Sequence, residues 1–135
     1  MTIGGEYPPL VDPMADKLDV RVQLDGARLL VMGGTGFLGK VWLSMLLHHF
    51  PEVAHIHLVV RPRKRGGVVT QTSEERFWAE IATSEVFDPI RERYPGGAYD
   101  AMLSEKSTVI PGDVTEPFGG IPEDIRQDIR GTLTA

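Results

Sequence analysis

The sequence predicts an α/β fold built on a parallel sheet, and three observations lead to it. A short apolar run over residues 28–32 is ended by a glycine-rich turn, which suits a strand buried on both faces. Apolar residues then recur at helical spacing until Pro51, and a second strand pattern, alternating at first and then apolar, follows over residues 55–60. Strand, turn, helix and strand thus occupy about 33 residues, the size of a βαβ unit with parallel strands. The predicted class is a Rossmann-type doubly wound parallel sheet, incomplete, because only its N-terminal half is present.

The rest of the chain continues the same alternation. Residues 1–26, rich in glycine and proline, are predicted to form an irregular leader with a short ordered piece at 20–24. Residues 27–135 are predicted to be the N-terminal part of the Rossmann domain, truncated. Along them we predict, in order, a loop over 61–71, a helix opened by the capping box Thr72–Glu75, a helical piece over 89–94, a third strand over 107–110, a helix over 122–130 and a fourth strand beginning at 133–135.

Composition narrows the functional classes. The net charge of −5 argues against a nucleic-acid partner, because neutralising phosphates requires a surplus of lysine and arginine. The chain has no cysteine, which excludes a disulfide framework, a cysteine nucleophile and thiolate metal sites. No apolar run reaches the roughly 20 residues of a transmembrane helix, and no secretory signal opens the sequence. We therefore expect a cytoplasmic protein without a transmembrane segment; peripheral membrane contact and the oligomeric state stay open.

The glycine turn carries the main functional prediction. It comprises Gly33, Gly34, Thr35, Gly36, Phe37, Leu38 and Gly39, and it matches G-x-G-x-x-G between an apolar strand and an amphipathic helix. A pyrophosphate needs backbone N–H donors and a positive helix end close by, so the turn must be nearly free of side chains. Gly36 lets the phosphates approach, Gly39 lets the helix lie close to the first strand, and the Thr35 hydroxyl can bind a phosphate oxygen. We predict dinucleotide binding; the alternative is a turn that only connects two elements.

The residue after the second strand indicates which dinucleotide is bound. An NAD-specific site usually has a carboxylate there to bind the ribose 2′-hydroxyl, whereas this chain has Arg61 after Val60. A guanidinium can pair with a 2′-phosphate through two charge-assisted hydrogen bonds. We therefore predict NADPH rather than NADH as the cofactor, with Arg61 at the phosphate. Arg63, Lys64 and Arg65 either join it or form a solvated basic loop.

Asp113 directly follows the third predicted strand, within Gly112-Asp113-Val114. Because consecutive strands of a Rossmann half lie side by side, their carboxyl ends line one crevice. We predict that Asp113 accepts a hydrogen bond from the adenine amino group and that Val114 lies against the ring. The alternative is an aspartate that caps a turn or a helix.

Four segments carry a resemblance to a known family. They are Thr35–Lys40 at the turn, Leu58–Arg63 at the second strand, the insertion from Ser73 to Asp88, and Val109–Pro117 at the third strand. With them, residues 27–135 resemble the fatty acyl-CoA reductases, also called male-sterility-type reductases, within the extended short-chain dehydrogenases/reductases. The resemblance implies a two-step, NADPH-dependent reduction of a long-chain acyl-CoA thioester, through an aldehyde to an alcohol. It also implies that the cofactor residues are Gly33, Thr35, Gly36, Phe37, Leu38, Gly39, Arg61 and Asp113.

The active-site pattern of that family, Tyr-x-x-x-Lys, is absent from this chain. The residues four places after Tyr7, Tyr94 and Tyr99 are Val11, Ala98 and Leu103. Without the tyrosine and lysine there is no proton donor for the developing alkoxide. We therefore expect the catalytic residues beyond residue 135, an active enzyme in the intact parent and an inactive fragment here.

Three other functions stay open at this point. A thioester reductase domain that acts on an acyl chain bound to a carrier protein would need the same turn and the same arginine. A non-catalytic NADP-binding sensor would use the fold without the chemistry. A sugar-nucleotide epimerase or reductase is a weaker alternative.

The histidines and the helix tryptophan are interpreted as structural. His48, His49, His55 and His57 lack the carboxylate-rich partners of a metal site, so no metal is predicted. Trp42 stands at helical spacing in the first helix and is predicted to lie in the core.

Overall fold

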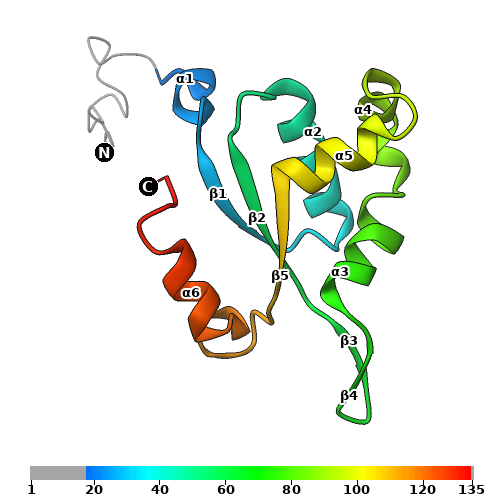
Figure 1. Ribbon diagram of the computed structural model, residues 1–135, viewed down its shortest axis with the longest axis vertical. Coiled ribbons are helices and arrows are strands. Elements are labelled where there is room, and N and C mark those ends of the chain that lie inside the picture. The colour runs from blue at the N-terminus through cyan, green and yellow to red at the C-terminus, as the bar shows by residue number, and fades with distance from the viewer. Residues whose placement is uncertain (1–17, 135) are drawn as a thin grey trace, which may run out of the picture.

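The computed structural model describes residues 18–134 and confirms a parallel sheet. Its strands are β1 (Arg28–Met32), β2 (His55–Val60) and β5 (Ser107–Pro111), paired in the order β1-β2-β5 (Figure 1). β1 and β2 have the predicted bounds, and β5 extends one residue further than predicted. The expectation that the first strand is buried on both faces is wrong: the residues of β1 are exposed or half-buried, because β2 is its only strand neighbour among the described residues. β2 is the central strand and is almost wholly buried, because it has a neighbouring strand on each side and its apolar residues from Leu58 to Val60 face both sides of the sheet.

The predicted βαβ unit is present, with α2 (Phe37–His49) between β1 and β2. Its buried apolar face, Leu43, Leu46 and Leu47, packs on the sheet, and the helix ends before Pro51. The prediction for Trp42 is wrong, because 47% of this residue is exposed.

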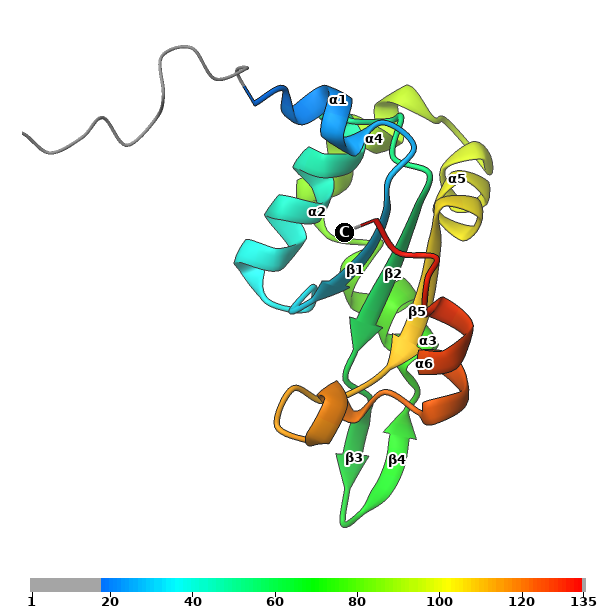
Figure 2. The ribbon, with the colours of Figure 1, turned by 90° about the vertical axis from the view of Figure 1, so that its left-hand side faces the viewer.

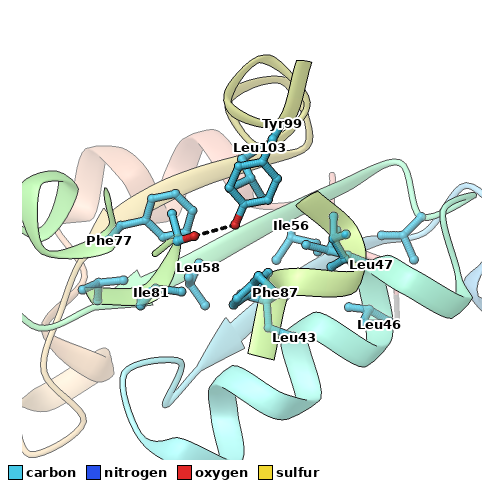
Figure 3. Close-up of a cluster of buried hydrophobic side chains, with 14 residues drawn as sticks. Leu43, Leu46, Leu47, Ile56, Leu58, Phe77, Ile81, Phe87, Tyr99 and Leu103 are labelled. Atoms are coloured by element: carbon cyan, nitrogen blue, oxygen red, sulfur yellow. Dashed lines mark hydrogen bonds between the residues drawn. The ribbon is translucent and has the colours of Figure 1, made fainter. Parts of the chain in front are cut away.

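The larger hydrophobic cluster fills the space between one face of the sheet and the helices that cover it (Figure 3). Alternate residues of β2, namely Ile56, Leu58 and Val60, point into this cluster because successive side chains of a strand face opposite ways. The Tyr99 hydroxyl donates to the carbonyl oxygen of Ala82 at 2.6 Å. This bond satisfies the polar end of a buried ring and ties two inserted segments together.

The segment over residues 73–106, which begins with the insertion from Ser73 to Asp88, is mostly helical, with turns over 82–84 and 94–97. It comprises α3 (Ser73–Arg76), the π-helical segment η1 (Phe77–Ile81), the 3₁₀ segment η2 (Glu85–Phe87), α4 (Asp88–Arg93) and α5 (Ala98–Lys106). The predicted capping interaction is confirmed, since the Thr72 hydroxyl accepts from the Glu75 N–H at 3.1 Å. α5 was not predicted. Only Tyr99 and Leu103 are buried along it, so its apolar stripe is short and gives a weak periodic signal.

Residues 61–71 contain a β-hairpin where a loop was predicted. β3 (Arg63–Arg65) pairs antiparallel with β4 (Val68–Gln71), and the hairpin projects beyond the end of the sheet (Figure 2). Gly66 and Gly67 connect the strands with φ of +59° and +80°. A two-residue hairpin turn requires such left-handed conformations, which glycine adopts without strain. The basic residues of β3 are all exposed, so apolar burial contributes little to holding the hairpin in place.

The opposite face of the sheet is covered in part by η3 (Pro117–Gly120) and α6 (Glu123–Ile129) (Figure 1). α6 falls within the predicted helix. Thr134 then lies beside β1: its N–H donates to the Arg28 carbonyl at 2.9 Å, and the Arg28 N–H donates to the Thr134 hydroxyl at 2.9 Å. The chain has therefore reached the edge of β1 where a fourth strand would pair. Ala135, part of that predicted strand, lies outside the described residues.

The short ordered piece predicted near residue 20 is the helix α1 (Val20–Leu24), capped by Asp19. The rest of the predicted leader, residues 1–17, lies outside the described residues. Over residues 18–134, no helix combines the length and apolarity that crossing a bilayer demands. In the same part of the chain, no cluster of three or more histidine or acidic side chains is arranged to hold a metal ion.

His57 gives the fold a testable pH dependence. Its residue is only 8% exposed, and within the described residues neither ring nitrogen has a hydrogen-bond partner. Burial lowers the pKa of His57, and His55 and Arg28 lower it further. As the pH falls below about 6.5 the unfolded chain therefore takes up the proton first. The stability that the neutral ring provides is complete above that pH and is lost as the pH falls toward the lower pKa of the folded state.

We therefore expect urea denaturation to show a lower midpoint at about pH 5 than at about pH 7.5. His57→Phe should make this difference smaller, and His55, whose pKa is also lowered by burial, accounts for part of what remains. A difference that stays the same in the variant would show that His57 does not cause it.

Candidate dinucleotide-binding site

The glycine turn lies at the predicted junction between strand and helix, from the end of β1 to the start of α2. Gly33 has a φ of +85°, a left-handed conformation that other residues rarely adopt. At Gly39 an added Cβ would lie 2.0 Å from the Gly33 carbonyl oxygen and 2.9 Å from its carbonyl carbon. Only glycine therefore allows α2 to start so close to the end of β1.

The space in front of Gly36 is open. A Cβ added there would meet no atom nearer than the Gly33 carbonyl oxygen, at 4.0 Å. Gly36 is the N-cap of α2, and no side chain of the described residues caps this helix. The N–H groups of its first turn have no partner within the helix and are available to a ligand. The turn therefore fits a pyrophosphate, which needs such donors and the positive end of a helix.

The remaining residues of the turn have different surroundings. Gly34 serves close packing, because an added Cβ would lie 2.8 Å from Cδ1 of Leu58. Thr35 is half-buried, whereas Phe37 and Leu38 are 78% and 79% exposed. The start of α2 thus presents two apolar side chains to the surface beside the open turn.

The parallel register brings the predicted residues to one end of the sheet. Met32 pairs with Val59, and Val60 pairs with Pro111. The glycine turn, Arg61 and Asp113 therefore follow the same ends of three neighbouring strands, in that order across the sheet (Figure 1). Open α/β sheets bind their ligands outside these ends.

A cavity of about 640 Å³ lies beside the end of the sheet and the hairpin; we call it the cationic pocket. Its lining includes the basic residues Arg61, Arg63, Lys64, Arg65 and Arg76 and the acidic residues Asp113 and Glu116. This local excess of positive charge suits an anionic group, although the chain as a whole carries −5. Neither the glycine turn nor Val114, which is 71% exposed, lines this pocket.

Arg61 and Asp113 form an ion pair in the pocket, with Nε 3.2 Å from Oδ2. The other carboxylate oxygen of Asp113 accepts from the N–H of Thr115 at 3.0 Å and from its hydroxyl at 2.7 Å. These bonds to Thr115, and then the Arg61 charge, hold the pKa of Asp113 below its usual range. Asp113 therefore caps a turn, which was the alternative role for it. The predicted adenine contact is a separate property of its Oδ2 and stays a prediction.

The loop that carries Asp113 is packed on residues that sequence reasoning did not select. A Cβ at Gly112 would lie 2.4 Å from Cγ1 of Val59 and 2.7 Å from the Gly119 carbonyl oxygen. The Asp113 N–H donates to that same oxygen at 2.7 Å. Phe118 has a φ of +55°, unusual for a residue with a side chain. The glycines in this stretch mark turns in the sequence, but nothing local to them indicates that the two turns touch.

Arg63 also reaches the pocket, and its guanidinium binds Glu80. Nε of Arg63 donates to Oε1 of Glu80 at 3.0 Å, and Nε of Arg76 donates to Oε2 at 2.7 Å. Arg76 first, and Arg63 with it, holds the pKa of Glu80 below its usual range. Sequence reasoning missed Glu80 and Arg76 as site residues. Glu80 stands 17 positions after Arg63, and no local pattern links a helix of the insertion to the hairpin.

Comparison with known proteins decides the family. A family model described as male sterility protein matches residues 31–135, which include the glycine turn, Arg61 and Asp113. The chain belongs to this family. The match confirms the resemblance to fatty acyl-CoA reductases that the sequence motifs indicated.

Similarity to individual proteins supports the same family. The chain is 37% identical over 105 residues to "Fatty acyl-CoA reductase 1" of Gallus gallus, an alignment that covers 78% of this chain and 18% of the relative. It is 32% identical over 92 residues to "Alcohol-forming fatty acyl-CoA reductase" of Simmondsia chinensis, covering 68% of this chain and 17% of the relative. The chain therefore spans less than a fifth of the length of these relatives.

A solved structure supports the fold of the chain. The reductase domain of a nonribosomal peptide synthetase from Mycobacterium tuberculosis matches it with a TM-score of 0.54 at 21% identity. The match covers 79% of this chain and 22% of that one. Together with the parallel sheet, it confirms the Rossmann-type class.

Proposed function

We propose that the chain is the NADPH-binding portion of a fatty acyl-CoA reductase, which reduces a long-chain acyl thioester to a fatty alcohol through the aldehyde. The observation that carries the proposal is the open space in front of Gly36 at the start of α2, beside a strand that leads into Arg61 at a cationic pocket. The printed names of the relatives support the substrate class. The cytoplasm is the proposed location, which a fluorescent fusion of the full-length protein would test.

In this proposal each part of the dinucleotide meets a different part of the chain. The first N–H groups of α2 and the Thr35 hydroxyl bind the pyrophosphate. When the cofactor binds, the Arg61 guanidinium exchanges its ion pair with Asp113 for one with the 2′-phosphate, which carries more negative charge. Arg63 lines the same pocket. The Oδ2 atom of Asp113 is then available to accept from the adenine amino group, with Val114 beside the ring. When bound, the nicotinamide cofactor supplies the hydride.

The proton donor for reduction lies elsewhere in the parent, because this sequence contains no Tyr-x-x-x-Lys. We therefore propose that residues 1–135 alone do not reduce a thioester. Assays of the full-length protein with acyl-CoA and with an acyl carrier protein would separate the proposed reductase from a domain that unloads a carrier. Absence of product from both substrates, with NADPH still bound, would instead support an NADP-binding sensor.

Replacing Arg61 with alanine tests the cofactor assignment. Full-length protein should bind NADPH more tightly than NADH, and Arg61→Ala should weaken NADPH binding by about 10- to 100-fold, the worth of charge-assisted hydrogen bonds to one guanidinium. NADH affinity should hardly change, since NADH has no 2′-phosphate. Cofactor fluorescence measures both affinities.

Arg130→Ala is the matched control, because Arg130 is exposed at the end of α6 and does not line the pocket. It should bind both cofactors as the wild type does. Equal affinities of the wild type for NADPH and NADH would remove the role given to Arg61.

A further inference from the structure

The Glu80 carboxylate, which does not itself line the cationic pocket, binds two arginines that do. Oε1 of Glu80 accepts from Nε of Arg63 at 3.0 Å and also from the Nη2 atom of that guanidinium. Oε2 accepts from Nε of Arg76 at 2.7 Å. Both arginines line the pocket and Glu80 does not. Glu80 therefore determines where these two positive charges lie without occupying the space a ligand would take.

The network continues to the backbone at the end of β2. Nη1 of Arg76 donates to the carbonyl oxygen of Arg61 at 2.8 Å. The carbonyl oxygen of Val60, the residue before Arg61, accepts a hydrogen bond from the buried Ser73 hydroxyl at 2.6 Å. Residues of α3 thus hold two consecutive backbone carbonyls, those of Val60 and Arg61, and so fix the backbone from which the Arg61 side chain extends. Through Arg76, Glu80 is connected to the arginine assigned to the 2′-phosphate.

This arrangement compensates for two local weaknesses. The strand β3 is exposed along its whole length, so apolar packing does not fix Arg63. Arg61, Arg63 and Arg76 also repel one another when they share one pocket, and a carboxylate between two of them offsets that repulsion. The Glu80 and Arg76 side chains are only 27% and 18% exposed, so their attraction is screened less than that of a surface pair.

The π-helical segment η1 brings Glu80 to this position. The Ala82 N–H donates to the Phe77 carbonyl at 2.9 Å, a step of five residues instead of four. Phe77 and Ile81 stay buried in the core on either side of Glu80. Single π-turns within helices occur frequently at functional sites, where they re-aim a side chain.

We infer that Glu80 is a positioning residue for the cofactor pocket, which acts through Arg63 and Arg76 to set the preference for NADPH over NADH. The inference rests on the proposed function, since it assigns the pocket to the 2′-phosphate. It adds a residue outside the glycine turn and the strand ends, on a helix of the insertion.

The test is Glu80→Gln in the full-length protein. Glutamine keeps the size of the side chain but offers one acceptor oxygen, and its amide nitrogen faces a guanidinium that cannot accept. NADPH affinity should fall about tenfold while NADH affinity stays the same. NADH uses the same glycine turn, so its unchanged affinity also shows that the variant is folded. Adenosine 2′,5′-bisphosphate and 5′-AMP, titrated by calorimetry, should repeat the contrast without the nicotinamide.

Glu74→Gln is the matched control. Glu74→Gln removes the same charge, from a residue of α3. Within residues 18–134, the one hydrogen bond to the Glu74 side chain comes from the Trp78 indole N–H, which a glutamine oxygen can also accept. It should leave the ratio of NADPH to NADH affinity unchanged. Arg76→Lys keeps the charge but cannot reach both Glu80 and the Arg61 carbonyl, so it should lower the ratio as Glu80→Gln does.

The outcomes separate this inference from the proposed function. A wild type without preference for NADPH would overturn both. A wild type whose preference depends on Arg61 but is unchanged in Glu80→Gln would overturn only the inference. An increase in NADPH affinity in Glu80→Gln would also overturn it, because Glu80 would then act merely as an anion that competes with the phosphate.

Discussion

Gly36→Val is expected to abolish NADPH binding while the fold stays intact. The backbone at Gly36 has a φ of −75°, which any residue adopts, and an added Cβ comes no nearer than 4.0 Å to another atom. The protein therefore has room for valine, but the two methyl groups would occupy the space proposed for the pyrophosphate. We expect the affinity to fall by at least about 100-fold, equivalent to about 2.7 kcal/mol. Cofactor fluorescence on the full-length variant measures the loss.

Gly97→Val provides a control of the same kind. Gly97 is the N-cap of α5 and has a φ of −68°. A Cβ added there would have no neighbouring atom of the described residues within 4 Å. Gly97 shares the negative φ and the open space of Gly36, although its ψ of −10° is helical whereas that of Gly36 is 164°. It lies at a helix start away from the carboxyl ends of the strands. This variant should bind NADPH normally. If Gly36→Val bound it equally well, the glycine turn would not be the phosphate site.

Gly39→Ala is expected to damage the fold itself. The added methyl would lie 2.0 Å from the Gly33 carbonyl oxygen and 3.0 Å from the Gly34 Cα, so α2 must move away from β1. We expect a loss in the free energy of unfolding of about 3 kcal/mol or more, at the upper end of the range for overpacking. Urea denaturation of the full-length protein measures it, and NADPH binding should weaken in parallel because the turn deforms.

Gly36→Ala is the comparison within the same turn. It adds the same methyl group where the nearest atom is 4.0 Å away, and replaces glycine by alanine at an N-cap. Its cost should not exceed about 1 kcal/mol. Equal losses at both positions would show that the crowding at Gly39 is relieved by a small local shift, contrary to our expectation.

The elements that sequence reasoning predicted well are those whose signal is local. β1 is a short apolar run that ends at a glycine, and β2 alternates at first and is then apolar; the structure has both with the predicted bounds. α2 ends where Pro51 requires it to end. The hairpin was missed although Gly66-Gly67 is a recognised turn pair, because β3 is wholly basic and neither exposed strand alternates apolar with polar residues.

What the amino-acid order alone settled is the junction: glycines between a strand and an amphipathic helix, with Arg61 at the end of the next strand. These features depend on neighbours in the chain, since left-handed φ, helix periodicity and strand burial are short-range properties. Only the tertiary packing decided which charged side chains form ion pairs. Arg61 reaches Asp113 because β2 and β5 are adjacent, and Arg63 reaches Glu80 because the insertion folds back on the sheet. Such pairs join residues far apart in the chain, and no local pattern encodes them.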